Sequence, residues 1–121
     1  MPKRIQMSRQ KPWRADNPKA VKVDRTTRYG NPFAVDKAVV VTWNHGNATG
    51  SITAQNTFEA VAYFRDWMNG VVDIPTVTRP PVWTLAGHDL ACWCPVGQYC
   101  HADVLLELAS ATTATTEGPS A

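Results

Sequence analysis

The sequence predicts a small single α/β domain, with a short mixed sheet and two main helices in the order β-β-(β)-α-β-α. Two observations support this fold class. Apolar segments with strand periodicity precede a segment with helical spacing, and a further strand–helix pair follows it. The chain has 121 residues, 44% of them hydrophobic, which suits one domain and argues against full disorder.

The first half of the chain supplies most of the expected strands. Residues 4–8 form a short candidate strand, and residues 20–24 alternate apolar and charged side chains as a half-buried strand does. Residues 38–43 are mostly apolar and β-branched, which favours a buried strand, and residues 44–47 are predicted to form a turn.

The clearest helix is expected to begin at Asn56. An Asn at this place caps a helix well, and Glu59 three residues later completes a capping-box pattern. Apolar residues then recur at helical spacing on one face until Asn69 and Gly70 end the helix. The residues of that face are Ala60, Val61, Phe64, Trp67 and Met68.

The last part of the chain predicts a strand, a loop and a helix. Three prolines in residues 71–81 exclude a long regular element, and residues 88–93 predict a strand. A helix is expected over residues 101–109, with Asp103 in its first turn, where the helix dipole favours an acid. Residues 110–121 have no apolar periodicity and are predicted to be a disordered tail.

Charge is distributed unevenly along the chain. Residues 1–28 hold nine of the twelve Lys and Arg and have a net charge of +7, whereas residues 29–121 have −5. We expect a basic N-terminal segment over residues 1–19, with a proline-containing loop at 10–19, before the α/β domain over residues 20–109. Such a charge split favours a phosphorylated small molecule or nucleic acid as partner, although a solvated basic arm explains it equally well.

No segment is long and apolar enough to span a membrane, and no secretory signal is apparent. Three cysteines, an odd number, argue against a disulfide framework and for reduced thiols. The expected location is therefore the cytoplasm, with no membrane partner.

The densest group of reactive side chains comprises Cys92, Cys94, Cys100 and His101, at a strand end and a helix start. Three thiolates and an imidazole match a tetrahedral zinc site. Alternatively, Cys100 and His101 are a catalytic pair, because a helix N-terminus and a neighbouring His both favour the thiolate. Simple packing is the third interpretation. Trp93 is expected to pack beneath the sheet.

A second group lies in the loop that follows residues 20–24. Arg25 and Arg28 suit phosphate, and Tyr29 suits base stacking; Asn31 follows in a tight Gly-Asn-Pro turn. We include Asp103, in the first turn of the last helix, among the candidate ligand-binding residues. An ordinary polar loop anchored by its aromatic residues is the alternative.

Both groups resemble the signatures of domain-of-unknown-function family 4326, small proteins of bacteria and their viruses. The matching segments are residues 25–33 and residues 87–105, and the resemblance covers about residues 20–109. It implies that Arg25, Gly30, Asn31, Pro32, Phe33, Cys92, Cys94, Cys100, His101 and Asp103 occupy motif positions. It makes a bacteriophage origin plausible and implies no activity, and residues 34–55 stand out as an inserted hairpin.

The leading hypothesis is a protein that binds or processes a nucleotide-like or nucleic-acid ligand at a site formed by both loops. A small zinc module with a structural Cys/His site is one alternative. A phage-encoded protein that acts on a host protein without catalysis, in the host cytoplasm, is the other. The sequence leaves open whether the protein is an enzyme.

Overall fold

The computed structural model describes residues 2–10, 12–94 and 98–117, with side chains up to residue 111. The chain forms two compact units, Met1–Gly30 with Pro81–Ala121 as the first and Asn31–Pro80 as the second. Within the described residues, no helix has the length and apolar character needed to cross a bilayer.

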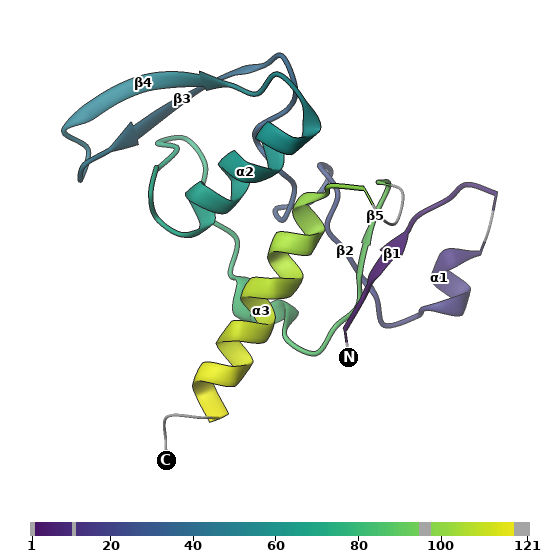
Figure 1. Ribbon diagram of the computed structural model, residues 1–121. Helices are drawn as coiled ribbons and strands as arrows, with labels where there is room; N and C mark the ends of the chain where they lie inside the picture. The colour runs from purple at the N-terminus through teal and green to yellow at the C-terminus, as the bar shows by residue number, and fades with distance from the viewer. Residues whose placement is uncertain (1, 11, 95–97, 118–121) are drawn as a thin grey trace. The chain divides into compact units, whose positions relative to one another are not determined.

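The first unit is built around a three-stranded parallel sheet (Figure 1). Strand β5 (Leu90–Cys92) lies in the middle, between β1 (Arg4–Gln6) and β2 (Val21–Lys22). In register, Ile5 lies opposite Ala91, and Val21 lies opposite Leu90. The N-terminal segment therefore contributes an outer strand of the sheet.

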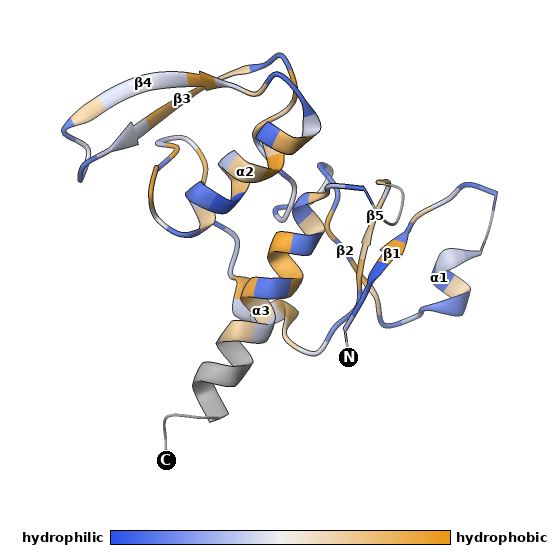
Figure 2. Cartoon of the chain, in the orientation of Figure 1, coloured by the Kyte–Doolittle hydropathy of each residue, from blue (hydrophilic) through white to orange (hydrophobic). Residues whose placement is uncertain are grey.

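Three helical elements complete this unit: α1 (Trp13–Asp16), the 3₁₀ helix η1 (Val82–Leu85) and α3 (His101–Glu117). Apolar and hydrophilic residues alternate along the first turns of α3 (Figure 2). Its buried residues Val104, Leu105 and Ala109 give it an apolar face, and α3 packs against η1, β5 and β1.

The second unit consists of a hairpin and one helix. Strands β3 (Ala38–Trp43) and β4 (Ala48–Thr53) pair antiparallel, and Asn44, His45 and Gly46 in the turn all have positive φ. Asn and Gly tolerate this backbone conformation better than most residues, which agrees with the predicted turn.

Helix α2 (Thr57–Met68) starts and ends as expected. The side chain of Asn56 accepts a hydrogen bond from the Glu59 amide (2.8 Å), and the Glu59 carboxylate accepts one from the Gln55 amide (2.9 Å). Phe64 and Trp67 are fully buried on its apolar face. The sequence pattern thus predicted this helix correctly.

The α/β fold class is confirmed, with the strands divided between two sheets. Residues 13–16, expected in a loop, form the short helix α1, and α3 continues past Ala109 to Glu117. The rest of the segment expected to be a disordered tail, residues 118–121, lies outside the described residues. Ala and Thr in residues 111–116 lack a strong apolar stripe, so periodicity alone did not reveal the longer helix.

Candidate metal and ligand site

The candidate site lies where the three parallel strands end. Ser8 and Arg9 follow β1, Asp24 and Arg25 follow β2, and Trp93 and Cys94 follow β5. The N-terminus of α3 comes to the same region, because His101, its first residue, bonds to the Val23 carbonyl and Cys100 directly precedes it. Parallel strands all present their carboxyl ends at one edge, which is where open α/β sheets usually bind ligands.

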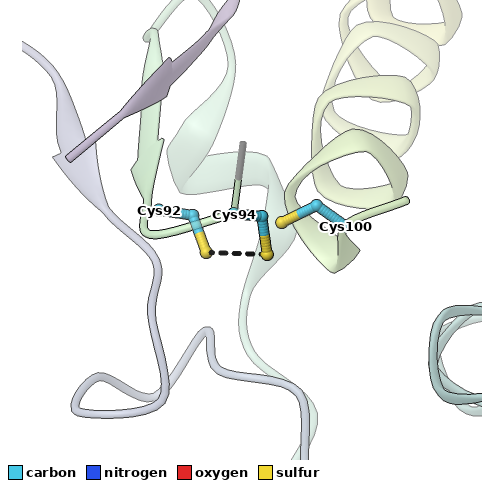
Figure 3. Close-up of side chains that lie close together, drawn as sticks. All are labelled: Cys92, Cys94 and Cys100. Atoms are coloured by element: carbon cyan, nitrogen blue, oxygen red, sulfur yellow. Dashed lines mark hydrogen bonds between the residues drawn. The ribbon is translucent and has the colours of Figure 1, made fainter. Parts of the chain in front are cut away.

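Three thiols converge at this edge. The sulfur atoms of Cys92, Cys94 and Cys100 all lie within 4.8 Å of one another, and all three cysteines are free. The sulfurs of Cys92 and Cys94 are 3.8 Å apart, and the sulfur of Cys100 points toward Cys94 (Figure 3). A metal–sulfur distance of about 2.3 Å places two sulfurs of a tetrahedral site about 3.8 Å apart. The observed spacing therefore fits thiolate ligation of one ion.

His101 is held by the strand beside it. Its Nε2 lies 2.6 Å from the carbonyl oxygen of Val23. Because a carbonyl only accepts hydrogen bonds, Nε2 carries a proton, and Nδ1 lies 3.8 Å from the sulfur of Cys100, to which it donates when it is protonated as well. Structure thus brings together all four residues of the predicted Cys/His group, with the imidazole against one of the three sulfurs.

The thiols differ in how readily they ionise. Hydrogen bonding from Cys92, and then from His101 and the Ala102 amide, lowers the pKa of Cys100 to about 3. The same interaction with Cys100, together with burial, raises the pKa of Cys92. Burial and the neighbouring Cys100 raise the pKa of Cys94. Without a metal, the negative charge of the cluster therefore lies on Cys100.

A buried cation lies close to the thiols. The Arg4 side chain, only 5% exposed, has its Nε 3.6 Å from a carboxylate oxygen of Asp103. Burial raises the pKa of Asp103, while the Arg4 charge opposes that shift. The same charge favours the ionised form of Cys94. Asp103, expected to bind ligand, thus pairs with Arg4 in this structure.

A cavity of about 270 Å³ opens beside the thiols. Its lining residues are Asp24, Arg25, Thr26, Cys92, Trp93, Cys94 and His101. The indole of Trp93 donates a hydrogen bond to Asp24 (3.0 Å), and the guanidinium of Arg9 lies 5.7 Å from the Trp93 ring centroid. Trp93 is 45% exposed, so the expectation that it packs beneath the sheet is wrong.

Asp24 holds the loop that carries Arg25. One carboxylate oxygen accepts bonds from the amide (3.1 Å) and hydroxyl (2.5 Å) of Thr26. Burial raises the pKa of Asp24, but these bonds, that of Trp93 and the charge of Lys22 outweigh it, so the pKa is lowered. An ionised Asp24 thus fixes the wall of the cavity.

The remaining predicted ligand-binding residues have other contacts. Arg28 lies over the Tyr29 ring and donates to its hydroxyl (3.1 Å), which lies 2.7 Å from the hydroxyl of Thr84. Neither Arg28 nor Tyr29 is among the cavity-lining residues. Asn31 belongs to the second unit, where its side chain donates to the Ala60 carbonyl and accepts from the Phe33 amide.

Sequence reasoning assigned no role in this site to Trp93, Asp24, Arg4 or Arg9. The available signal was positional, because each lies in or directly after a predicted strand. That signal becomes useful only once the strands are known to be parallel neighbours.

Comparison with known proteins identifies a family for this chain. The family model described as Domain of unknown function (DUF4326) matches residues 5–111, which is most of the chain. No curated protein and no solved structure matches the chain. The family match agrees with the resemblance of the two motif segments, and it extends to the N-terminal strand β1.

Proposed function

We propose that this chain, which belongs to the DUF4326 family, binds a transition-metal ion of the zinc class through Cys92, Cys94 and Cys100. The observation that supports this function is the convergence of three free sulfurs within 4.8 Å. Thiolates are soft ligands that zinc prefers, and the buried charge of Arg4 offsets part of their negative charge. Reduced thiols also suit the cytoplasm.

Metal ligation explains the thiols better than nucleophilic catalysis does. Cys100 is only 1% exposed, so a substrate has no direct access to its sulfur. The end of β5 and the start of α3 are connected in the chain by residues 93–100. A bound ion would join these two ends directly. The ion would therefore stabilise the folded state in proportion to its affinity.

Elemental analysis combined with native and denaturing mass spectrometry tests this function. We expect one zinc per chain in the native protein, lost on denaturation with a chelator. Cys94→Ser should lose the ion, whereas Ser51→Ala, in strand β4 of the second unit, should retain it. A folded protein that takes up no zinc, even when zinc is added under reducing conditions, would refute the proposal.

A phosphorylated, nucleotide-like ligand or nucleic acid is the second candidate function. It is favoured by the cavity in which Arg25 and Thr26 line the same wall as the thiols. A guanidinium binds phosphate with paired, charge-assisted hydrogen bonds, and the exposed Trp93 offers an aromatic surface for a base.

Arg25→Ala tests this candidate, with Arg28→Ala as the matched control, because Arg28 contacts Tyr29 instead of lining the cavity. We expect Arg25→Ala to weaken binding by about 1–3 kcal/mol and Arg28→Ala to change it little. Calorimetry with a panel of nucleotides and single-stranded oligonucleotides measures the difference. Equal affinities of wild type and Arg25→Ala for every compound that binds would exclude the role of Arg25.

A further inference from the structure

We infer that the metal ion keeps one coordination position open toward the cavity, and that a nucleoside monophosphate occupies this position while Arg25 binds its phosphate. This inference rests on the proposed thiolate metal centre. Structural zinc sites are closed by four protein ligands, whereas catalytic sites have three protein ligands and leave the fourth position for water or substrate. An ion held by three cysteines would therefore be able to bind a ligand from solution.

The protein supplies three ligands at mutual ligand distance. They are the sulfurs of Cys92, Cys94 and Cys100, and the His101 nitrogens are not part of that group. The imidazole is anchored through Nε2 on the Val23 carbonyl, and its Nδ1 faces the sulfur of Cys100 at 3.8 Å. His101 is thus placed as a neighbour that orients a ligand thiolate.

Other side chains near the ion have different partners. Both carboxylate oxygens of Asp24 accept hydrogen bonds, from Thr26 and from Trp93. The carboxylate of Asp103 pairs with Arg4. Residues 95–97, which lie outside the described part of the chain, are Pro, Val and Gly and have no metal-binding side chains.

The cavity lies on the accessible side of the sulfur cluster. Cys92 and Cys94 line it, and Cys94 is partly exposed, whereas Cys100 does not line it and is 1% exposed. Figure 3 shows the sulfurs of Cys92 and Cys94 pointing in the same direction from the end of β5. A fourth ligand from solution would therefore reach the ion through this cavity.

Charge and shape define the class of that ligand. Three thiolates on a divalent ion leave a net charge of −1, and the charge of the buried Arg4, which pairs with Asp103 and also acts on Cys94, offsets it in part. Arg25 then adds a cation to the lining of the cavity, where the Thr26 hydroxyl is already bonded to Asp24. Trp93 presents an exposed ring, already contacted by the flat guanidinium of Arg9, on which a planar base can stack.

Replacement of zinc by Co²⁺ tests both the thiolate ligands and the open coordination position, because the absorption spectrum of Co²⁺ depends on its ligands. Absorption from thiolate-to-cobalt charge transfer reports ligation by the cysteines, and the d–d bands report the fourth position. We expect AMP to shift the d–d bands of the wild type saturably. Arg25→Gln should raise the AMP concentration for half-saturation about tenfold or more, whereas Arg28→Gln should leave it unchanged.

The outcomes separate this inference from the proposed function. Absence of the charge-transfer absorption means that the thiolate centre itself is wrong. Charge-transfer absorption with d–d bands that neither AMP nor inorganic phosphate shifts overturns the open position alone. Paramagnetic NMR of the cobalt protein that shows the ring N–H of a metal-bound imidazole, lost in His101→Asn, identifies His101 as the fourth ligand and also overturns the open position. If inorganic phosphate shifts the d–d bands as much as AMP does, the base does not contribute to binding, and the proposal of a nucleoside monophosphate is wrong.

Discussion

Gly30→Ala tests whether the loop that carries Arg25 is held by a close backbone approach. A Cβ at Gly30 would lie 2.5 Å from the Cα of Arg25 and 2.8 Å from the carbonyl oxygen of Asp24. Both neighbours are backbone atoms, so no side chain can rotate away to relieve the contact. Residues 24–30 must therefore move apart.

The size of the effect follows from those two distances. Real Cβ atoms essentially never approach other heavy atoms closer than 3.0 Å, so the loop must open by at least several tenths of an ångström. Overpacking of this kind typically costs about 1–3 kcal/mol of unfolding free energy. The Asp24 carbonyl that is displaced also accepts hydrogen bonds from the amide (3.0 Å) and hydroxyl (2.9 Å) of Thr27, which we expect to weaken.

Urea unfolding followed by tryptophan fluorescence measures the loss. With a denaturant slope of about 2 kcal/mol/M, the midpoint should fall by about 0.5–1.5 M. Gly46→Ala is the control, because its Cβ would meet nothing within 4 Å and only its positive φ is strained. If Gly30→Ala unfolds at the wild-type midpoint, the close approach of residues 25 and 30 is not a constraint and the reasoning fails.

Three further predictions concern a helix cap, a carboxylate and a thiol. Asn56→Ala removes the cap on the Glu59 amide and should cost about 1 kcal/mol in urea unfolding, with no effect on metal content. Because the pKa of Asp24 is lower in the folded than in the unfolded state, its ionisation stabilises the fold above the unfolded pKa of 3.8, and this stability is lost as pH falls through the folded pKa. Asp24→Asn should therefore flatten the dependence of the unfolding free energy on pH in this acidic range. An unchanged dependence would contradict the lowered pKa. In metal-free protein, the ultraviolet absorbance of a thiolate should be present at pH 5 and change little up to pH 7, and Cys100→Ser should remove it; a wild type without this absorbance would contradict the assignment of the thiolate to Cys100.

Local patterns predicted the elements whose stability is local. Asn56 and Glu59 mark the start of α2, and the apolar spacing that follows gives its buried face, so this helix could be located from its own residues. The strand at residues 90–92 and the start of α3 were found for the same reason. Helix α1 was missed because its four residues follow a proline and are too few to show periodicity.

The sequence by itself determined the family, the α/β class and the cysteine pattern, because each depends on residues that lie close together in the chain. Only the tertiary structure decided that Arg25 shares a cavity with Cys92 and Cys94, while the Asn31 side chain bonds to Ala60 and Phe33. The physical reason is the parallel pairing of β1, β5 and β2. Hydrogen bonds between strands far apart in the chain bring their carboxyl ends to one edge, and no local periodicity encodes which strands will pair.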